Sequence, residues 1–427
     1  MKAKPITDHI FALHADITDA PYFEGIWSIP DGVTLNSYIV RGEKTALIDL
    51  YRDWESAPQQ MNEQLSSVGL TAADIDYVIL NHLEPDHTGF LREFHAMNPD
   101  AEIISTAKGI ALAQNFCKAG AGTYRAVKTG DELDLGKGIV LQFTETPNVH
   151  WPETMMTYEH SSGVLFSCDA FGSYGKTGNR IFDDEFSTEE HAFYEREALR
   201  YYANIVASFS TAVKSAIAKF DGVPVNVVAP SHGLVWRAHP EVILERYASY
   251  AGCNTGGKLE NKICVVYGSM YGSTKAGVDA VVSGITKAGE RRAAAGGNAP
   301  EVVVLEIPAT DISVVLAQAY DAAGIVMAMP TYEYKMFPPA AYVLNLFARK
   351  HFTGKKALRI GSWGWIGGAK KEYDEAVLPL KWDEIESYEW QGIPSAEDLE
   401  VLAQRGAALA DTVADTVAGA VAASERK

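Results

Sequence analysis

The residues from 262 to the C-terminus alternate short apolar runs with longer amphipathic segments. The apolar runs are KICVVYG, EVVVLEIP, AGIVMAMP, KALRIGSW and YEWQGIP, and the segments between them have the length and periodicity of helices. Parallel strands need a long crossover connection, which is normally a helix. Five strands connected in this way predict a doubly wound parallel sheet with helices on both faces.

The first half of the chain has a different pattern, with more turns and more strands. Its runs LNSYIVRG, KTALIDL, DYVILNH, AEIISTA, IVLQFTETP and GVLFSCDAF predict strands, and residues 56–69 and 190–220 predict helices. The stretch AGCNTGGKLEN, residues 251–261, is polar and rich in glycine, as expected of a linker. We therefore expect two domains, residues 1–252 and 261–427, joined by residues 253–260.

The composition is that of a soluble globular protein, with 47% hydrophobic and 22% charged residues. The net charge of −18 argues against a nucleic acid or an anionic membrane as a partner. No apolar run is long enough to span a bilayer, and the N-terminus lacks the apolar core of a signal peptide. The cysteines are Cys117, Cys168, Cys253 and Cys264. They form no C-x-x-C pair, so we expect a reduced, cytoplasmic protein without structural disulfides and without a fused rubredoxin.

The segment ILNHLEPDHTGF, residues 79–90, concentrates potential metal ligands directly after an apolar run. It contains His82, Glu84, Asp86 and His87 within six positions. In a loop after a strand, His82 and Glu84 can face one metal ion while Asp86 and His87 turn to a second. Taken alone, the segment is also compatible with a solvated polar loop.

Three further candidates follow strand-like runs in the first half of the chain. They are His150 in TPNVHWPET, Asp169 in LFSCDAFG and His232 in VVAPSHG. Asp169 follows a wholly apolar run, where a lone carboxylate needs a cationic partner. A metal pair bridged by Asp169 would supply that partner. Either histidine alone would more often be a hydrogen-bonded core residue, but the seven residues together predict a two-metal site.

The run VVYGSMYGSTKAG predicts a phosphate-binding loop between a strand and a helix. Its serine and threonine hydroxyls and its backbone amides lie at a helix N-terminus, which favours an anion. The chain has no P-loop lysine motif and no G-x-G-x-x-G, so a nucleoside triphosphate or a dinucleotide fits poorly. Tyr332, Trp363 and Trp365 follow later strands and can flank an isoalloxazine ring. The three loops in this order favour FMN over a serine-rich turn with ordinary aromatic packing.

The predicted FMN contacts fall in three loops. The first loop contributes Ser269, Met270, Tyr271, Gly272, Ser273 and Thr274; the second, in PTYEYKMFPP, contributes Pro330, Thr331, Tyr332 and Glu333; the third, in GSWGWIGGAKK, contributes Ser362, Trp363, Gly364, Trp365 and Gly367.

The order H-x-E-x-D-H, H-W-P, strand-end Asp and S-H-G, followed by the five-strand half, resembles the flavodiiron proteins, or A-type flavoproteins. The resemblance covers nearly the whole chain. It implies a metallo-β-lactamase-like αβ/βα sandwich with two non-haem iron ions, followed by a flavodoxin-like domain with FMN. It also implies reduction of dioxygen to water, of nitric oxide to nitrous oxide, or of both. In this family one iron would be held by His82, Glu84 and His150, and the other by Asp86, His87 and His232, with Asp169 as the bridge.

Glu84 separates this segment from the hydrolases of the same superfamily, which typically show H-x-H-x-D-H. An oxygen ligand in place of an imidazole suits iron better than zinc, and it gives the site three carboxylates. A redox metal pair also explains the presence of a flavin domain, for which a hydrolase has no use. A metal-dependent hydrolase with a flavodoxin-like binding domain is the main alternative, and a non-enzymatic electron carrier is the other.

The family resemblance also bears on the substrate pocket. Many relatives carry a His-Gly pair near the irons where this chain has Glu24 and Gly25. Tyr201 and Tyr202 resemble residues near the pocket of relatives, although helix-core packing explains them equally well.

The electron donor is expected to be a separate molecule. The resemblance suggests a rubredoxin or reduced coenzyme F420, and it implies a head-to-tail homodimer or a dimer of dimers in which the flavin of one chain meets the metals of the other. The stretch ARKHFTGKKALR contains a basic cluster of Arg349, Lys350, Lys355, Lys356 and Arg359. This cluster is either a docking surface for an acidic donor or a solvated helix end.

Overall fold

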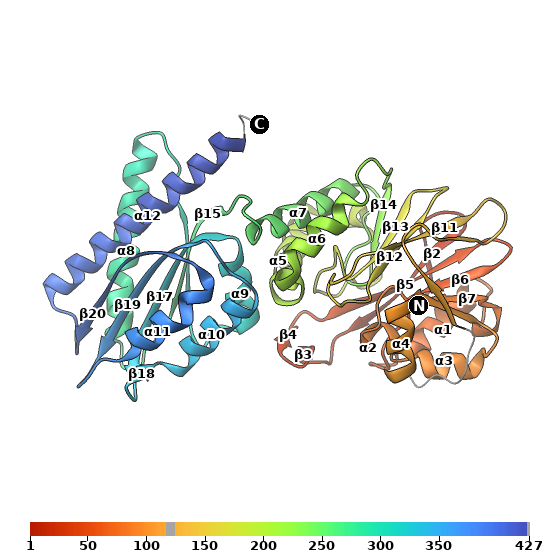
Figure 1. Cartoon of the computed structure of the whole chain (residues 1–427), viewed down its shortest axis with the longest axis horizontal. Helices are drawn as coiled ribbons and strands as arrows, with labels where there is room; N and C mark the ends of the chain where they lie inside the picture. The colour runs from red at the N-terminus through yellow and green to blue at the C-terminus, as the bar shows by residue number, and fades with distance from the viewer. Residues whose placement is uncertain (117–123, 425–427) are drawn as a thin grey trace. The chain divides into compact units, whose positions relative to one another are not determined.

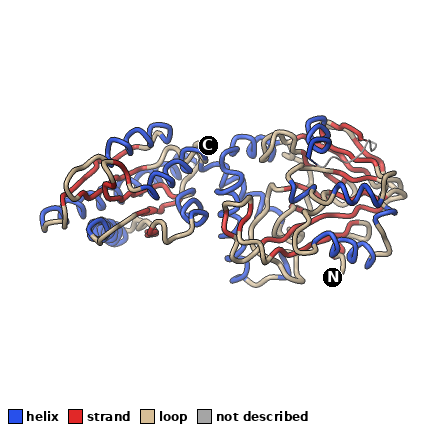
Figure 2. The backbone as a smooth tube through the Cα atoms, turned by 90° about the horizontal axis from the view of Figure 1, so that it is seen from below, coloured by secondary structure: helices blue, strands red, loops and turns tan. Residues whose placement is uncertain are grey.

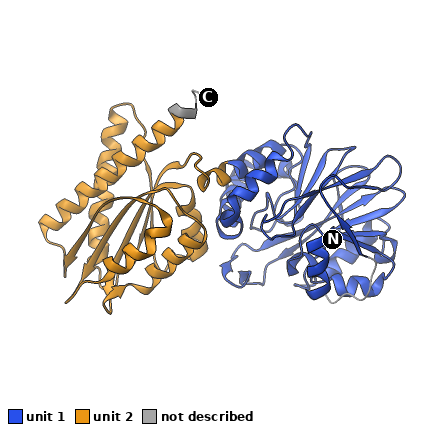
Figure 3. Cartoon of the chain, in the orientation of Figure 1, with its two compact units in different colours: residues 1–248 blue, residues 249–427 orange. Residues whose placement is uncertain are grey.

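The structure is a computed structural model that describes residues 1–116 and 124–424. Contacts divide the chain into two compact units, Met1–Ala248 and Ser249–Lys427 (Figure 3). Both units combine sheets with covering helices (Figures 1 and 2).

The first unit contains two sheets whose inner faces share one core (Figure 1). The seven-stranded sheet has the order β1 (Lys4–Pro5), β2 (Ile10–Ile17), β5 (Val33–Arg41), β6 (Thr45–Ile48), β7 (Tyr77–Ile79), β8 (Glu102–Thr106) and β9 (Tyr124–Val127). The five-stranded sheet has the order β10 (Glu132–Asp134), β11 (Val140–Glu145), β12 (Met155–Glu159), β13 (Val164–Cys168) and β14 (Val227–Pro230). The core joins Tyr38 and Ile79 of the first sheet to Phe143 and Phe166 of the second, so burial of these apolar side chains holds the sheets together.

Helices accompany both sheets of this unit (Figure 1). Beside the first sheet are α1 (Ala57–Ser67), α2 (Pro85–Thr88), α3 (Leu91–Met97) and α4 (Ala107–Phe116); beside the second are α5 (Thr188–Tyr201), α6 (Ser210–Ala218) and α7 (Pro240–Cys253). A short hairpin of β3 (Tyr22–Phe23) and β4 (Trp27–Ser28) stands apart from both sheets.

The long helix predicted over residues 190–220 is interrupted. After α5 the chain forms a π-helical turn, Tyr202–Val206, and a 3₁₀ turn, Ala207–Phe209, before α6 begins. All five residues of the π-helical turn are buried, whereas a regular helix on the outside of a sheet turns part of its circumference to solvent. The apolar periodicity on either side is continuous, so the sequence pattern did not reveal the break.

The second unit is a flavodoxin-like doubly wound sheet. Its parallel strands have the order β16 (Glu301–Glu306), β15 (Glu260–Tyr267), β17 (Ala322–Tyr332), β19 (Lys356–Trp363) and β20 (Asp383–Gln391), and β18 (Lys335–Met336) pairs with β17. One face is covered by α8 (Ser273–Ala294) and α12 (Ala396–Ser424), the other by α9 (Ile312–Tyr320), α10 (Pro338–Arg349) and α11 (Ala369–Val377) (Figure 1). The strand order reverses between β15 and β17, and ligands of such sheets bind at the carboxyl end of this reversal. The predicted fold class is therefore confirmed for both halves of the chain.

Several sequence expectations need comment. The fifth strand of the second unit begins at Asp383 rather than near Tyr388, because an edge strand can carry charged residues on its exposed face. The alanine-rich tail forms helix α12 up to Ser424. Cys168, Cys253 and Cys264 are buried free thiols, while Cys117 lies outside the described residues. No helix within residues 1–116 and 124–424 has the length and apolar character needed to cross a membrane.

The predicted basic cluster is not a continuous surface. Lys355 is buried, and its ammonium donates to the carbonyls of Tyr320 and Ala322 at 2.7 Å each. Arg359 is also buried, and its guanidinium donates to Glu389 at 2.6 Å. Lys355 lies directly before β19 and Arg359 lies within it, and both side chains are buried, so the cluster is neither one docking surface nor one solvated helix end.

Candidate functional site

The ends of four strands gather the seven candidate metal ligands into one cluster. His82 and Glu84 lie in the loop after β7, Asp86 and His87 in helix α2, His150 between β11 and β12, Asp169 directly after β13, and His232 after β14. All except the part-buried Glu84 are buried.

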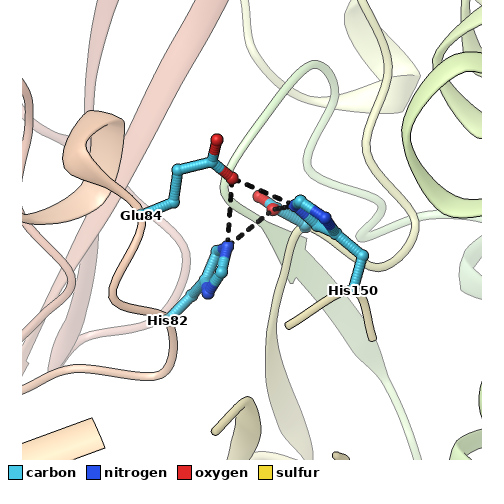
Figure 4. A group of neighbouring side chains, drawn as sticks. His82, Glu84 and His150 are labelled. Atoms are coloured by element: carbon cyan, nitrogen blue, oxygen red, sulfur yellow. Dashed lines mark hydrogen bonds and ion pairs between the residues drawn. The ribbon is translucent and has the colours of Figure 1, made fainter. Parts of the chain in front are cut away.

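The first group of ligand atoms contains His82, Glu84, His150 and one oxygen of Asp169. The Glu84 carboxylate lies 3.3 Å from His82 Nε2 and 3.1 Å from His150 Nε2. The Oδ2 atom of Asp169 lies 3.1 Å from His150 Nε2 and 3.5 Å from His82 Nε2. Figure 4 shows the two imidazoles and the Glu84 carboxylate converging on a shared point.

The second group contains Asp86, His87 and His232. The Oδ2 atom of Asp86 lies 3.5 Å from His87 Nε2 and 3.3 Å from His232 Nε2. The other oxygen of Asp169, Oδ1, lies 2.9 Å from His87 Nε2 and 3.3 Å from His232 Nε2. Asp169 therefore stands between the two groups, with one carboxylate oxygen facing each.

The donor atoms of the cluster are those of a metal site rather than of a hydrogen-bonded core. Among the described residues, His87 Nε2, His150 Nε2, His232 Nε2, Asp169 Oδ1 and both Asp86 oxygens are buried without a hydrogen-bond partner. Buried polar atoms are almost always paired, so this concentration of unpaired nitrogens and oxygens requires an occupant. Two cations would satisfy all of these atoms at once.

Two contacts on the far side of the imidazoles fix their orientation. His82 Nδ1 donates to Glu153 Oε1 at 2.8 Å, and His232 Nδ1 donates to the carbonyl of Thr34 at 3.0 Å. Each of these bonds occupies Nδ1 and directs Nε2 into the cluster, where a metal ion would take the place of its proton. Glu153 was not predicted, although it lies three residues after His150 in the stretch HWPE.

The electrostatics of the cluster favour cations. Burial alone would lower the pKa of His82, but Glu153 and Glu84 raise it to about 10. Burial would raise the pKa of the Asp169 carboxyl, yet His87 and its neighbouring imidazoles hold it well below its usual range. Metal ions would replace protons at these nitrogens, so metal uptake is expected to release protons and to weaken as the pH falls.

Cys168 lies beside the second group, within reach of His87 and Asp169. Burial raises the pKa of its thiol well above the usual value, and the neighbouring Asp169 carboxylate raises it further. Because the thiolate is the form that binds metals, Cys168 is a poor ligand here.

We expect Glu153→Gln to weaken metal retention by about 10- to 100-fold. The amide can still accept the His82 proton, but it lacks the charge that supports the imidazole as a ligand. Metal loss to a chelator, followed by metal analysis, measures the effect. Glu153 and Glu145 both line a cavity of about 200 Å³, but the Glu145 carboxylate accepts a hydrogen bond from the backbone amide of Thr129. Glu145→Gln is therefore the matched control. Equal retention in both variants would contradict a role for Glu153.

The three candidate pocket residues differ in their positions. The ring of Tyr201 packs against the ring of His232, with centroids 5.6 Å apart. The Tyr202 hydroxyl instead donates to Ser210 Oγ at 3.1 Å. Glu24 lies in the turn of the β3–β4 hairpin and accepts a hydrogen bond from Trp27 Nε1 at 2.9 Å.

The hairpin also contributes an apolar residue that sequence reasoning missed. Phe23 is buried, and its ring centroid lies 5.4 Å from that of His232 and 6.1 Å from that of Tyr201. It covers this side of the second ligand group with a hydrocarbon surface. A single aromatic residue in a polar turn carries no signal of such a role.

The second unit has a cavity of about 480 Å³ at the carboxyl edge of its sheet. The first loop lines it with Ser269, Met270, Tyr271, Ser273 and Thr274, the second with Pro330 and Thr331, and the third with Ser362, Trp363, Gly364 and Trp365. The predicted residues Gly272, Tyr332, Glu333 and Gly367 belong to these loops but do not line the cavity. Gly392 and Ile393, after β20, line it and were not predicted.

The first loop of this cavity is built for an anion. Gly272, in the left-handed region with φ of 88°, precedes helix α8 and no side chain caps the helix. The first backbone amides of this 22-residue helix are therefore available to bind an anion at its positive end. Thr274 is buried, and its hydroxyl lies 2.8 Å from that of Ser362, which links the first loop to the third.

Comparisons with known proteins agree with this geometry. Residues 33–233 match the family described as ODP family beta lactamase. The anaerobic nitric oxide reductase flavorubredoxin of Salmonella arizonae is 34% identical over 377 residues, which are 88% of this chain and 75% of that protein. The chain belongs to the flavodiiron protein family.

Solved structures show the same fold as this flavodiiron protein. The flavodiiron protein of Giardia intestinalis superposes with a TM-score of 0.90 at 24% identity, over 98% of both chains. Rubredoxin oxygen:oxidoreductase of Desulfovibrio gigas gives a TM-score of 0.87 at 24% identity, over 96% of this chain and 98% of the other. Membership of the family makes the chain an oxidoreductase.

Proposed function

We propose that this flavodiiron protein is an FMN-dependent di-iron reductase. It takes electrons from a separate donor and reduces dioxygen to water, nitric oxide to nitrous oxide, or both. The observation that carries the proposal is the position of Asp169, whose two oxygens lie 3.1 Å from His150 and 2.9 Å from His87, one in each ligand group. A single carboxylate shared in this way is the expected centre of a two-metal site.

The donor set supports iron over zinc. Three carboxylates and four imidazoles surround the two positions, and this mixture of hard oxygen and borderline nitrogen donors suits non-haem iron. His82, Glu84 and His150 would hold one ion; Asp86, His87 and His232 would hold the other, with Asp169 shared.

The cavity of the second unit supports FMN. Ser269, Ser273, Thr274 and the first amides of α8 would receive the phosphate, because they offer hydroxyls and N–H groups at a helix N-terminus. Trp363 and Trp365 would flank the ring.

Iron and FMN, when bound, supply the electron transfer that amino-acid side chains cannot perform. The chain's own residues hold and orient these groups and control water. Glu153 and the Thr34 carbonyl fix the protonation of the His82 and His232 rings, so that Nε2 faces the metal position. Phe23 excludes water from one side of His232. Reduction of one dioxygen to water consumes four electrons and four protons, so the pocket must also admit protons.

The deciding experiment is an analysis of metal and flavin in the purified chain, together with oxygen and nitric oxide consumption under a reduced donor. Two irons and one FMN per chain with turnover of either gas support the proposal. A colourless protein that contains zinc and hydrolyses an ester or amide would instead support the metal-dependent hydrolase.

A double change, Ser269→Ala with Thr274→Val, is expected to weaken FMN binding by at least about 100-fold. Each hydroxyl lost from a charged phosphate costs about 1.5–3 kcal/mol. Titration of the apoprotein with FMN, followed by flavin fluorescence, measures the change. The control is Thr286→Val on the same helix, whose hydroxyl donates to the carbonyl of Val282 and lines no part of the cavity. If both proteins bind FMN as the wild type does, these hydroxyls do not hold the phosphate.

The donor, the assembly and the location remain predictions. The name of the Desulfovibrio gigas relative, rubredoxin oxygen:oxidoreductase, pairs rubredoxin with oxygen, which favours a rubredoxin-type donor here as well. The homodimer or dimer of dimers rests on the family resemblance. A cytoplasmic location agrees with the three buried free thiols.

A further inference from the structure

The β3–β4 hairpin has little backbone support of its own. Its strands contain two residues each and form a separate two-stranded sheet, with Tyr22 opposite Ser28 and Phe23 opposite Trp27. An isolated two-stranded hairpin is at best marginally stable in water. Tyr22 is 50% exposed, whereas Phe23 and Trp27 are buried, so one face of the hairpin packs against the protein. Contacts with the rest of the first unit must therefore hold the hairpin in place.

One guanidinium makes such a contact. Arg200, near the end of α5, is buried, and its Nη1 donates to the backbone carbonyl of Ser28 at 2.6 Å. Its Nε donates to Glu197, one turn earlier on the same helix, at 3.1 Å. Its flat face lies over the ring of Tyr174, 4.6 Å from the centroid. The rigid fork and planar face of an arginine allow these three contacts at once, which a lysine ammonium cannot reproduce.

The contacts of Arg200 lead to the second ligand group through Phe23. Ser28 belongs to the strand that pairs with the strand of Phe23. The Phe23 ring is edge-on to the ring of Tyr174, with centroids 5.7 Å apart, and to the ring of His232, with centroids 5.4 Å apart. Arg200 thus contacts both the hairpin backbone and one of the rings against which Phe23 packs.

The ion pair of Arg200 and Glu197 is not explained by stability alone. Both residues are buried, at 5% and 8% exposure. Apolar side chains of similar volume can often replace a buried ion pair without loss of stability. The contact that such a replacement would lose is the hydrogen bond from the guanidinium to the Ser28 carbonyl.

We propose that Arg200 is a positioning residue that fastens the β3–β4 hairpin, so that Phe23 stays on the His232 ring and keeps water from the second ligand group. Exclusion of water suppresses side reactions of an active site. Complete reduction turns one dioxygen into two waters with four electrons and four protons, whereas release after two electrons and two protons gives hydrogen peroxide. A closed pocket retains partly reduced oxygen until the remaining electrons arrive. This effect on the products rests on the proposed reductase function and draws on the same electron donor.

The test replaces the ion pair by apolar side chains, Arg200→Met with Glu197→Met. Removal of Arg200 alone would leave the Glu197 carboxylate buried without this partner and destabilise the first unit, whereas the double change removes both charges. Amide hydrogen exchange of residues 21–29 in the holoprotein is expected to become about 10- to 100-fold faster, because a hydrogen bond from a charged group no longer opposes opening of the hairpin. Peptides from α1 should exchange as they do in the wild type.

The reaction products provide a second readout, which a purely structural role would not change. In the double variant part of the consumed dioxygen is expected to appear as hydrogen peroxide, so the donor electrons used per dioxygen fall from four toward two. Iron and FMN contents per chain should equal those of the wild type. Loss of folded protein would lower the rate without changing the number of electrons used per dioxygen.

The matched control is Arg246→Met with Glu195→Met. The Arg246 guanidinium lies 3.0 Å from the carboxylate of Glu195, which belongs to the same helix α5, and 5.9 Å from the centroid of the Trp236 ring. The control therefore also removes an ion pair from α5. Exchange of residues 21–29 and the number of electrons used per dioxygen should be those of the wild type.

Wild-type exchange of residues 21–29 in the Arg200 and Glu197 double variant would overturn the proposal. Complete conversion of dioxygen to water by that variant would overturn it as well. If the wild-type chain does not reduce dioxygen, the exchange measurement alone decides whether Arg200 fastens the hairpin. Failure of the wild-type chain to reduce either gas counts against the proposed function and not against this contact.

Discussion

Asp169→Asn is expected to remove both metal ions from the protein and to lower turnover by at least about 100-fold. The carboxylate is 1% exposed and faces one ligand group with each oxygen. The amide that replaces it has a single acceptor oxygen and no charge, so it can serve at most one group. Metal analysis after dialysis, with turnover measured on the same sample, gives the result.

A matched control separates this role from the general effect of losing a buried carboxylate. Asp183 is also 1% exposed, and its carboxylate accepts from the backbone amides of Arg237 and His239 at 2.8 Å. Asp183→Asn should lower the free energy of unfolding by about 1–3 kcal/mol while both irons stay bound. If Asp169→Asn retains two irons and normal turnover, Asp169 does not bridge the metals.

The second half of the chain was the more predictable part of the fold. Its three central strands, β15, β17 and β19, are buried by helices on both faces and therefore read as continuous apolar runs, and KALRIGSW coincides with β19. In the first half, the strand IFALHADI, β2, was missed because a buried histidine and alanines weaken its pattern. His14 there is buried and bonds the carbonyl of Gly178, a long-range partner that no local pattern contains.

The metal ligands could be proposed from the sequence because residue type and position after apolar runs identify them. The groups that surround these ligands could not be proposed from the sequence. Thr34 contributes only a carbonyl to His232, and any residue could supply that group. Asp49 follows the apolar run ALI and is buried, and its carboxylate accepts from the backbone amide of Asn81 at 2.8 Å. Burial raises the pKa of Asp49 to about 6. Its place beside the site follows only from the pairing of β6 with β7.

For the basic cluster, the sequence suggested a surface that the structure does not contain. Residues 349–359 are close in sequence, and the sequence alone suggested a single surface. Arg349 ends helix α10, Lys355 lies just before strand β19 and Arg359 lies within it, and the last two side chains are buried. Charge density along a chain predicts a surface only when all the charged residues face the same way, and a change of element within the run removes that condition.

His82→Ala is expected to abolish reduction of dioxygen and nitric oxide while FMN stays bound. The change removes an imidazole from the first ligand group and also leaves the Glu153 carboxylate buried without its partner at 2.8 Å. The FMN loops belong to the second unit, which has its own core of residues from its strands and from α8 and α12. The flavin content of the purified variant, read from its absorbance, should equal that of the wild type.

Two further variants make the result interpretable. Loss of a buried charge partner destabilises proteins by about 3–5 kcal/mol, so His82→Ala alone could fail through unfolding of the first unit. Glu84→Ala removes a ligand whose side chain is 14% exposed, and it should abolish turnover with a smaller loss of stability. His14→Ala, a buried histidine of the same unit outside the ligand cluster, should retain iron, FMN and turnover. Loss of FMN in the His82 and Glu84 variants would contradict the assignment of metal and flavin to separate units, because each unit would then depend on the other for its cofactor.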